Sequence, residues 1–385
     1  MPTIALVDSY YPRALADFGL DRVLLDGTYS DNVERAAALG FGTGGAYTRN
    51  LQELGWDARI LIPNALALQD LWTRENGVRR PWRAGWRYGP HIARLPIARS
   101  IAHRLPHLHG TLAAQIRRIR PDVLYVQDIN LISPSLAREL RRHVRLLVGE
   151  IASPLPPAAY LAPYDLIVSA LPTIVDTARG RGIAAEWIPL GFDDRWAGYR
   201  PATSRSIDAV FVGSISRLQP TTVPLLRAVA DRVPGLQIYG PGDPGMLESA
   251  GLRTHHHGPA WGSGMFSILG DSKIVVNRHG SIAGDFAVNM RMYEATGSGA
   301  ALVTERKSNI RELFEPGTEI ETYDTIDEAA EKTAQLLADP ERLDRVAAAG
   351  QARTLRDHSY ARRAERLTQV LDERLRGRST AGQAR

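Results

Sequence analysis

The stretch DFAVNMRMYEATGSGAALVTER, residues 285–306, holds the pattern that decides the fold. Its first half has helical spacing, Gly297 and Gly299 mark a turn, and residues 300–303 form a short apolar run typical of a buried strand. A helix that leads through a glycine turn into such a strand is the repeating half of a parallel α/β sheet. The helix carries one acid, Glu294, whose place in an apolar stretch serves either packing or a ligand.

Similar apolar runs recur along the whole chain and alternate with helical patterns, which predicts two α/β halves built on parallel sheets. Runs such as DVLYV and KIVVN are almost continuously apolar, as is typical of strands covered on both faces. In the first half we expect strands at residues 3–7, 58–62, 122–126, 144–148, 166–168 and 186–188. In the second half we expect them at 209–212, 236–239, 273–276, 300–303 and 320–323.

The composition is that of an ordinary globular protein with two domains. A chain of 385 residues is too long for one compact core, and its 44% hydrophobic and 23% charged residues are average values. The absence of cysteine excludes disulfides and thiolate metal sites. The sequence shows no signal-peptide pattern and no apolar run of membrane-spanning length, so we expect a cytoplasmic protein. The net charge of +5 favours anionic partners, although a solvated basic surface explains it equally well.

A polar stretch separates the two halves. Residues 191–208, GFDDRWAGYRPATSRSID, lack an apolar period and are rich in glycine, proline, serine and charge. We place the linker at residues 196–206, with one domain at 1–195 and the other at 207–359.

Three helices are predicted after the last strand. Residues 325–328 fit a capping box at the start of the first helix. Asp339 and Pro340 suit the N-cap and first turn of the second helix, which Gly350 is expected to close. The third covers residues 360–376.

Polar or glycine residues follow most of the expected strands, at the edge where parallel sheets bind ligands. In the first half these residues are Asp8, Asn64, Asp128, Glu150 and Ser169. In the second half they are Gly213, Ser214, Gly240, Asn277, Arg278, His279 and Thr304. Two such edges facing each other across a linker predict a ligand cleft between the domains.

The helix in the opening stretch is expected to begin near Ala287. Its first turn, with Asn289 and Met290, offers free amides and a partial positive charge that suit a diphosphate. Arg291 adds a formal charge, and Glu294 further along can accept hydrogen bonds from ribose hydroxyls. The alternative is a surface carboxylate paired with Arg291 at a spacing of three, worth about 0.2–0.5 kcal/mol.

Several segments resemble the CgeB-like glycosyltransferases, which are related to glycosyltransferase family 4. The specific matches are GPAWG (258–262), SKIVVNRH (272–279), NMRMYEATGSGAALVTE (289–305), ELFEPGTEIETYD (312–324) and AAAGQARTLRDHSYARR (347–363). Looser matches in the first half are RPDVLYVQDIN (120–130), LLVGEIASPLP (146–156) and WIPLGFD (187–193).

The resemblance implies a GT-B fold, with two Rossmann-like domains whose parallel sheets face each other across a cleft. It also implies a C-terminal helix, residues 360–380, that crosses back to the first domain. In such enzymes the second domain holds a nucleotide-sugar donor, whose sugar passes to an acceptor hydroxyl with retention of configuration.

The resemblance also implies roles for single residues. Glu294 is similar to the acid that holds the donor ribose. Arg217, beside Gly213 and Ser214 in a glycine-containing loop, resembles a phosphate partner. Gly258 and Trp261 fall in a loop that resembles the base-binding edge.

One position departs from the family pattern. Many family 4 enzymes carry a second glutamate eight residues before the ribose-binding acid, where this chain has Phe286 with Asp285 beside it. Either Asp285 substitutes for that glutamate, or the donor sugar is less polar at that face. Transfer of a hexose and transfer of a deoxysugar both stay open.

Sugar transfer requires an activated acceptor and a stabilised leaving diphosphate. If the reaction inverts the anomeric centre, Asp128 and Glu150 are candidate bases, because both end strands of the acceptor domain. With retention, the leaving phosphate itself can accept the proton. Arg217 and Arg278, with the helix amides, would stabilise the developing charge. No D-x-D motif stands at a strand end, so we expect neither a metal nor another cofactor.

The stretch GFGTGGAYTRNL, residues 40–51, satisfies the pattern G-x-G-x-x-G. A dinucleotide fingerprint also needs a strand before it and an acid after the next strand, and both are missing here. We interpret Gly44 and Gly45 as part of a loop that opens a helix and lets the backbone approach the donor phosphate or the acceptor.

Two further features carry weaker signals. The three histidines at 255–257 do not converge easily on one ion, which favours a base loop or a surface position over a metal site. Residues 71–104 interleave three tryptophans with eight arginines. Such a region is compatible with acceptor packing, with peripheral membrane contact or with a solvated insertion.

We expect a glycosyltransferase whose partners are a nucleotide-diphosphate sugar and a small-molecule or glycan acceptor, with no nucleic acid. One alternative is a non-enzymatic binder of nucleic acid or a membrane surface through residues 71–104. A second alternative is a nucleotide-sugar epimerase on the same fold.

Overall fold

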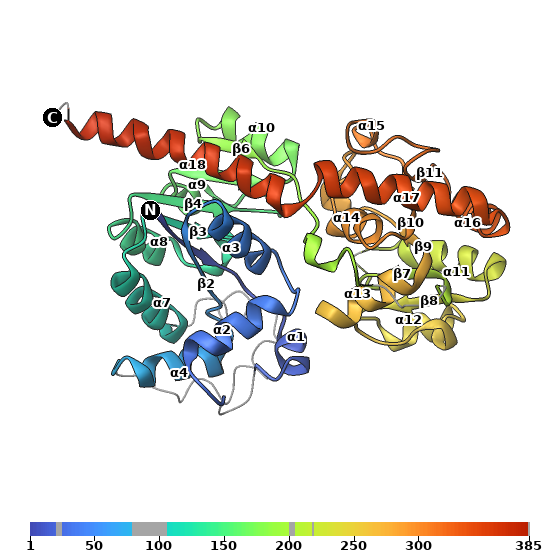
Figure 1. The fold of residues 1–385 in the computed structure, drawn as a ribbon, viewed down its shortest axis with the longest axis horizontal. Helices are drawn as coiled ribbons and strands as arrows, with labels where there is room; N and C mark the ends of the chain where they lie inside the picture. Colours follow the sequence, from blue (N-terminus) through green and yellow to red (C-terminus); the bar gives the residue numbers. More distant parts are fainter. Residues whose placement is uncertain (21–24, 79–105, 200–204, 218, 384–385) are drawn as a thin grey trace. The chain divides into compact units, whose positions relative to one another are not determined.

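The computed structural model describes residues 1–20, 25–78, 106–199, 205–217 and 219–383 (Figure 1). Contacts divide the chain into two compact units. The first unit comprises Met1–Ile188 together with Ala364–Arg385, and the second comprises Pro189–Arg363. The C-terminal helix α18 (Tyr360–Gln383) therefore belongs to the first unit from Ala364 onward.

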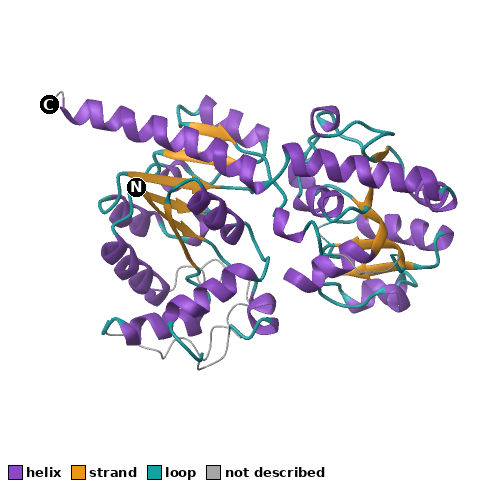
Figure 2. Cartoon of the chain, viewed as in Figure 1, coloured by secondary structure: helices purple, strands orange, loops and turns teal. Residues whose placement is uncertain are grey.

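The first unit is built on a parallel sheet of six strands in the order β2-β1-β3-β4-β5-β6. The strands are β1 (Thr3–Val7), β2 (Asp57–Leu61), β3 (Val123–Val126), β4 (Leu146–Glu150), β5 (Leu166–Ser169) and β6 (Ala185–Trp187). The helices are α1 (Pro12–Asp17), α2 (Tyr29–Ala38), α3 (Gly44–Glu53), α4 (Leu66–Glu75), α7 (Pro106–Ile119), α8 (Pro134–Arg141), α9 (Ala158–Leu161) and α10 (Pro172–Gly180). Helices and sheet alternate in layers in Figure 2.

The second unit repeats this plan with a parallel sheet of five strands in the order β11-β10-β9-β7-β8. The strands are β7 (Ile207–Val212), β8 (Leu236–Tyr239), β9 (Ser272–Asn277), β10 (Ala301–Glu305) and β11 (Glu321–Tyr323). The helices are α11 (Thr222–Arg232), α12 (Pro244–Ser249), α13 (Gly262–Asp271), α14 (Met290–Gly297), α15 (Ile310–Leu313), α16 (Ile326–Ala338) and α17 (Pro340–Asp357).

Helices cover both faces of the second sheet. One core joins α11, α16 and α17 to strand residues such as Phe211 and Val276. The opposite core joins α13 and α14 to Val210, Val212 and Val275. Because neighbouring strand residues point to opposite faces, a sheet buried on both sides needs an unbroken apolar run. The two-sided packing explains why the strands of this unit could be read from the sequence.

The predicted fold class is confirmed, and every expected strand is present with its ends shifted by two residues or fewer. Two helix predictions were wrong. The helix of the opening stretch begins at Met290 with Asn289 as its N-cap, because the preceding residues form a separate loop. Gly350 does not end α17, which continues to Asp357.

Gly350 is in the helix because it allows close packing. A Cβ atom built on Gly350 would collide with the backbone carbonyl oxygen of Glu319. We therefore expect Gly350→Ala to destabilise the protein by about 1–3 kcal/mol, although alanine is the better helix former. Gly377 in α18 provides the matched control, because a Cβ atom there meets no atom within 4 Å. Gly377→Ala should raise the melting temperature slightly, and equal effects of both changes would contradict the packing explanation.

The segments that enter and leave the second unit pair with each other inside it. The amide of Phe192 donates to the carbonyl of His358 at 2.8 Å, and the amide of Tyr360 donates to the carbonyl of Phe192 at 2.8 Å. Phe192 is fully buried and packs in the same core as Trp196. Residues before the predicted linker therefore already form part of the second unit.

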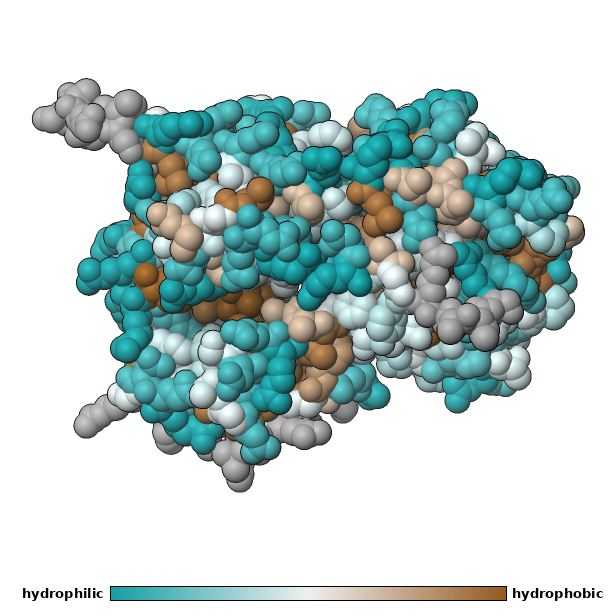
Figure 3. All heavy atoms as spheres, viewed as in Figure 1, coloured by the Kyte–Doolittle hydropathy of each residue, from teal (hydrophilic) through white to brown (hydrophobic). Residues whose placement is uncertain are grey.

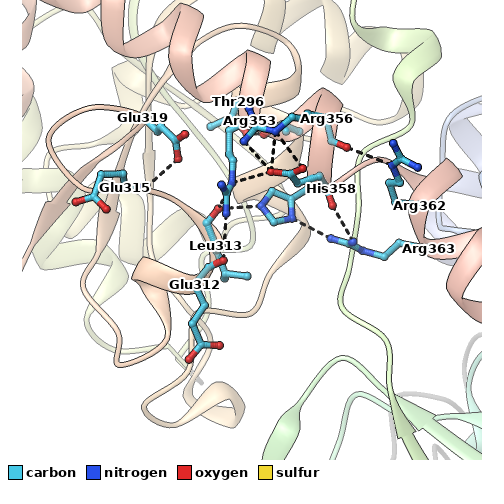
Figure 4. A network of polar contacts seen from close by, with 12 residues as sticks. Thr296, Glu312, Leu313, Glu315, Glu319, Arg353, Arg356, His358, Arg362 and Arg363 are labelled. Carbon is cyan, nitrogen blue, oxygen red and sulfur yellow. Dashed lines mark hydrogen bonds and ion pairs between the residues drawn. The ribbon is translucent and has the colours of Figure 1, made fainter.

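A buried arginine ties these segments together (Figure 4). The guanidinium of Arg363 donates to the carbonyl of Leu190 at 2.9 Å and to Nδ1 of His358 at 3.1 Å. Nε2 of His358 donates to the carbonyl of Leu313 at 2.8 Å. Burial lowers the pKa of His358 to about 4, which keeps the ring neutral and able to accept from Arg363.

Within the described residues, no helix is long and apolar enough to cross a membrane. Most of the atoms visible in Figure 3 are hydrophilic, with apolar atoms in small groups. Of the region at 71–104, residues 79–104 lie outside the described residues, so most of the prediction made for it falls there. Its described start packs inward, with Leu71 and Trp72 buried.

Candidate functional site

When the strands of each unit are numbered in chain order, both sheets have the order 2-1-3-4-5. The sheet of the first unit adds a sixth strand beside its fifth. In such sheets the connection changes direction between the first and third strands, and ligands bind beyond the carboxyl ends at that point. The switch point lies between β7 and β9 in the second unit and between β1 and β3 in the first. Polar side chains gather at both places.

In the second unit, α14 starts beside the end of β9. The Oδ1 atom of Asn289 accepts from the amide of Met292 at 3.1 Å, which caps the helix. Its Nδ2 atom donates to Oδ1 of Asn277 at 2.9 Å and to the carbonyl of Arg278 at 2.8 Å. Asn289 and Asn277 thus fix the helix start to the strand end. Within the described residues, the amides of Met290 and Arg291 have no protein acceptor and stay open to a ligand.

The predicted pair of Arg291 and Glu294 is present, at 2.7 Å between Nη1 and Oε2. It is not a surface pair, because Glu294 is only 6% exposed. Arg291 is held in place by the carbonyl of Val212 at 3.0 Å and by the sulfur of Met265 at 3.1 Å. Arg291 therefore fixes the carboxylate of Glu294 beside the end of β7. The second oxygen of Glu294 has no protein partner among the described contacts.

Arg278 extends from the end of β9 to the start of α11. Its Nη1 atom donates to Gln219 at 2.8 Å and to Thr222 at 3.1 Å. This brings a positive charge close to the loop that follows β7, where Gly213 and Ser214 lie. Arg217 in the same loop is exposed to solvent.

The end of β8 is tied to the loop before α13. The amide of Gly240 donates to the carbonyl of Gly258 at 2.8 Å, and Trp261 is the N-cap residue of α13. The histidines of this loop have ordinary partners. Nδ1 of His255 bonds the carbonyl of Leu236 at 2.9 Å, Nε2 of His256 bonds that of Gly240 at 2.8 Å, and the ring of His257 stacks on Tyr239.

Two other predicted residues differ in accessibility. His279 is buried, its Nε2 atom lies 3.3 Å from Oγ1 of Thr304, and burial lowers its pKa to about 4. It is therefore neutral near pH 7. Asp285 is exposed in the loop before α14, and its carbonyl accepts from the amide of Ser308 at 3.0 Å. The carboxylate of Asp285 is thus free to face solvent or a ligand.

In the first unit the switch point is organised by Asp8, which follows β1 and is buried. Its oxygens accept from the amide of Ser9 at 2.7 Å and from the amide of Gly44 at 3.2 Å. With its amide nitrogen turned toward Asp8, Gln127 donates to both carboxylate oxygens at 3.1 and 3.0 Å and accepts from the hydroxyl of Thr43. The carboxylate thereby holds the loop that opens α3, where Gly44 and Gly45 lie.

Glu150 ends β4 near the same point. One of its oxygens accepts from the hydroxyl of Tyr125 at 2.8 Å. Burial raises the pKa of Glu150 to about 7, the bond from Tyr125 opposes the rise, and the charges of Asp8 and Asp128 add to it. A carboxylate with such a pKa suits proton transfer near neutral pH.

Asp128, the other predicted base, is placed less favourably. It is exposed, and its Oδ1 atom caps the turn after β3 by accepting from the amide of Asn130 at 2.9 Å and from its side chain at 3.0 Å. The geometry therefore favours Glu150 over Asp128 as the proton acceptor of this unit.

The raised pKa of Glu150 leads to a prediction about how the stability of the folded protein depends on pH. The Glu150 carboxyl holds its proton more tightly in the folded state than in the unfolded state. The folded protein therefore loses stability as pH rises from about 4.5 to about 7. Glu150→Gln removes that ionisation and keeps an acceptor for Tyr125. Between pH 5 and pH 8 the variant should gain roughly 1–3 kcal/mol relative to the wild type. Parallel curves of melting temperature against pH would contradict the assignment.

The sequence placed Asp8 at the ligand-binding edge of the sheet but assigned it no role, and Gln127 was not predicted as a site residue. Asp8 carried a signal, since it follows the first strand directly, but nothing in the spacing links it to Gly44, 36 positions away. Asn64 and Ser169 carried the same signal and have structural roles. Asn64 bonds both the amide and the carbonyl of Tyr10, and Ser169 donates to the carbonyl of Ile151.

Part of the chain matches a known protein family. Residues 221–369 match the model of a family described as glycosyl transferase-like. This segment contains α14, Arg278 and most of the second unit. A search of curated protein sequences finds no match.

Similar solved structures cover nearly the whole chain. Sucrose-phosphate synthase from Thermosynechococcus elongatus has a TM-score of 0.60 at 12% identity, over 97% of this chain and 99% of that one. The Anabaena protein HepE, solved with UDP and glucose, has a TM-score of 0.60 at 13% identity, over 97% and 100%. AviGT4, a glycosyltransferase involved in avilamycin A biosynthesis, has a TM-score of 0.56 at 16% identity, over 98% of this chain and 99% of that one. The chain thus has the GT-B fold, with two parallel-sheet α/β domains, as predicted.

Proposed function

We propose that this protein is a glycosyltransferase that moves a sugar from a nucleotide-diphosphate sugar to an acceptor hydroxyl. The observation that carries the proposal is the buried pair of Arg291 and Glu294 at the switch point of the second unit. The match of residues 221–369 to the glycosyl transferase-like family supports the same reading. Among such enzymes, the motifs at 258–262 and 289–305 favour the CgeB-like group and family 4.

The second unit holds the donor in this proposal. The amides of Met290 and Arg291 bind a phosphate oxygen at the start of α14, where the helix carries a partial positive charge. The unpartnered oxygen of Glu294 accepts from a ribose hydroxyl. Arg278 and the exposed Arg217 offset the charge that develops on the leaving diphosphate. Gly258 and Trp261 border the nucleobase, and Asp285 reaches the donor sugar.

The first unit holds the acceptor. Glu150 accepts the hydrogen bond of the attacking hydroxyl and takes its proton as the new glycosidic bond forms and the bond to the diphosphate breaks. We propose that the hydroxyl attacks from the face that the diphosphate leaves, which retains the anomeric configuration. We also propose that helix amides and arginines, rather than a metal ion, stabilise the leaving diphosphate. NMR of the product anomer, with and without EDTA, tests both points. An inverted product or a loss of turnover on chelation would contradict them.

A thermal-shift screen with UDP, GDP, dTDP and their sugars tests donor binding directly. A ligand that binds only the folded state raises its stability by about 2.7 kcal/mol at 100 times its Kd. UDP has priority because HepE was solved with UDP and glucose. We expect one nucleotide to raise the melting temperature and its sugar to release nucleotide in the presence of an acceptor. No shift with any nucleotide would refute the proposal.

The same screen separates the rival functions. An epimerase would interconvert nucleotide sugars with no acceptor present. A binder of nucleic acid or membranes would ignore nucleotide sugars and associate with DNA or anionic vesicles in a salt-dependent way.

A further inference from the structure

We propose that Asp8 is a positioning residue that holds the loop of residues 42–45 against the ends of β1 and β3. This inference rests on the proposed function, because it assigns the loop to the acceptor side of that reaction. We call residues 42–45 the glycine loop. It leads directly into α3, at the switch point where a ligand of the first unit binds.

The glycine loop is shaped around the carboxylate. A Cβ atom on Gly42 would lie 2.7 Å from Oδ2 of Asp8, and one on Gly44 would lie 2.8 Å from the same oxygen. Any side chain at either position would collide with the carboxylate. The two glycines thus let the backbone come close enough for the amide of Gly44 to donate to Asp8 at 3.2 Å.

A second contact fixes the loop from the side of β3. Gln127 follows β3 and donates to both oxygens of Asp8, while its own carbonyl oxygen accepts from the amide of Gly44 at 3.2 Å and from the hydroxyl of Thr43. The loop is therefore bound by one carboxylate and one amide, each placed by the end of a different strand. All the donors around Asp8 are N–H groups, which is the arrangement that an ionised carboxylate requires.

The ionisation of Asp8 controls this arrangement. Burial raises the pKa of Asp8 to about 7, and the bonds from Ser9 and Gly44 oppose the rise. Below that pH the carboxyl takes up a proton, and the protonated oxygen becomes a donor that faces N–H donors. Glu150 at the end of β4 and Asp128 after β3 are the titratable groups coupled to this cluster, since the charges of Asp8 and Asp128 raise the pKa of Glu150. They carry no positive charge that would counter this protonation.

Asp8→Asn is the direct test, because it keeps the shape and replaces one accepting oxygen by a donor. The expected result is hydrogen exchange at the amide of Gly44 that is at least tenfold faster. In nucleotide release from the donor that the thermal-shift screen identifies, kcat should fall about tenfold while the donor KM stays within twofold. In the wild type, the protection of Gly44 should disappear below about pH 7. In the variant it should be low at every pH.

Asp128→Asn serves as the control for exchange, because that carboxylate is close but makes no bond to the glycine loop. It should leave the exchange of Gly44 unchanged. If Asp8→Asn does not fold, Gln127→Leu is tested in its place. We then expect exchange at the amide of Gly44 to be about threefold faster and kcat to be about threefold lower.

The outcomes separate the two proposals. Unchanged exchange at Gly44 in the folded variant, or faster exchange with unchanged kcat, would overturn the role of Asp8. A wild-type protein that neither binds nor cleaves any nucleotide sugar would overturn the proposed function instead. The exchange measurement would then still decide whether Asp8 holds the loop.

Discussion

Replacing Glu294 with glutamine is expected to lower kcat/KM for the nucleotide-sugar donor about 100-fold. The carboxylate is buried, and Arg291 holds one of its oxygens at 2.7 Å. We assign the other oxygen to the ribose. A hydrogen bond from a hydroxyl to a buried charge contributes about 1.5–3 kcal/mol, and losing it leaves a hydroxyl unpaired as well. The amide of glutamine still accepts from Arg291, so the fold should be kept.

The measurement is steady-state kinetics with the donor that the thermal-shift screen identifies, alongside the melting temperature of the variant. Glu248→Gln provides a matched control, because Glu248 is an exposed glutamate on α12 of the same unit. It should behave as the wild type. Kinetic constants for Glu294→Gln within twofold of the wild type would remove Glu294 from the donor site and leave the pair with a packing role only.

Glu150→Gln is the second large change, and it should act on turnover rather than on donor binding. General base catalysis contributes about 100-fold to 10,000-fold, so we expect kcat to fall at least 100-fold. The donor KM should stay within twofold, since the donor belongs to the second unit. Glu139→Gln, at an exposed position on α8, is the control. A loss of less than tenfold would assign the proton to the leaving diphosphate instead.

The hydroxyl of Tyr125 supplies a finer test of the same residue. Its bond to Glu150 lowers the pKa of that carboxyl, against the rise that burial causes. Tyr125→Phe should therefore raise the pKa of Glu150 further and move the acid limb of the kcat profile to higher pH. An acid limb that stays in place would show that Glu150 does not titrate in the reaction.

The strands could be predicted because they carry their own signal. The run at 236–239 was placed without error, and the strands at 272–277 and 301–305 were found to within two residues. Their sheet is buried on both faces, which requires apolar residues at nearly every position. The helices of the second unit were harder where tertiary contacts set their ends. Gly350 is a helix-ending residue by local rules, and only its contact with the carbonyl of Glu319 explains its place inside α17.

In the candidate site, too, local patterns could be predicted from the sequence and tertiary contacts could not. The pairing of Arg291 with Glu294 follows from helical spacing and was foreseen as an alternative. Its burial was not, because burial depends on Met265 and Val212 from other elements. The contacts of Asp8 with Gly44 and Gln127 join three distant parts of the chain, and no local pattern encodes them.

A crystal structure of the protein with bound UDP would show whether α14 and Glu294 hold the donor. We expect diphosphate oxygens within hydrogen-bonding distance of the amides of Met290 and Arg291, and ribose hydroxyls on the carboxylate of Glu294. UDP bound away from α14, or bound there while Glu294 contacts only Arg291, would contradict this assignment.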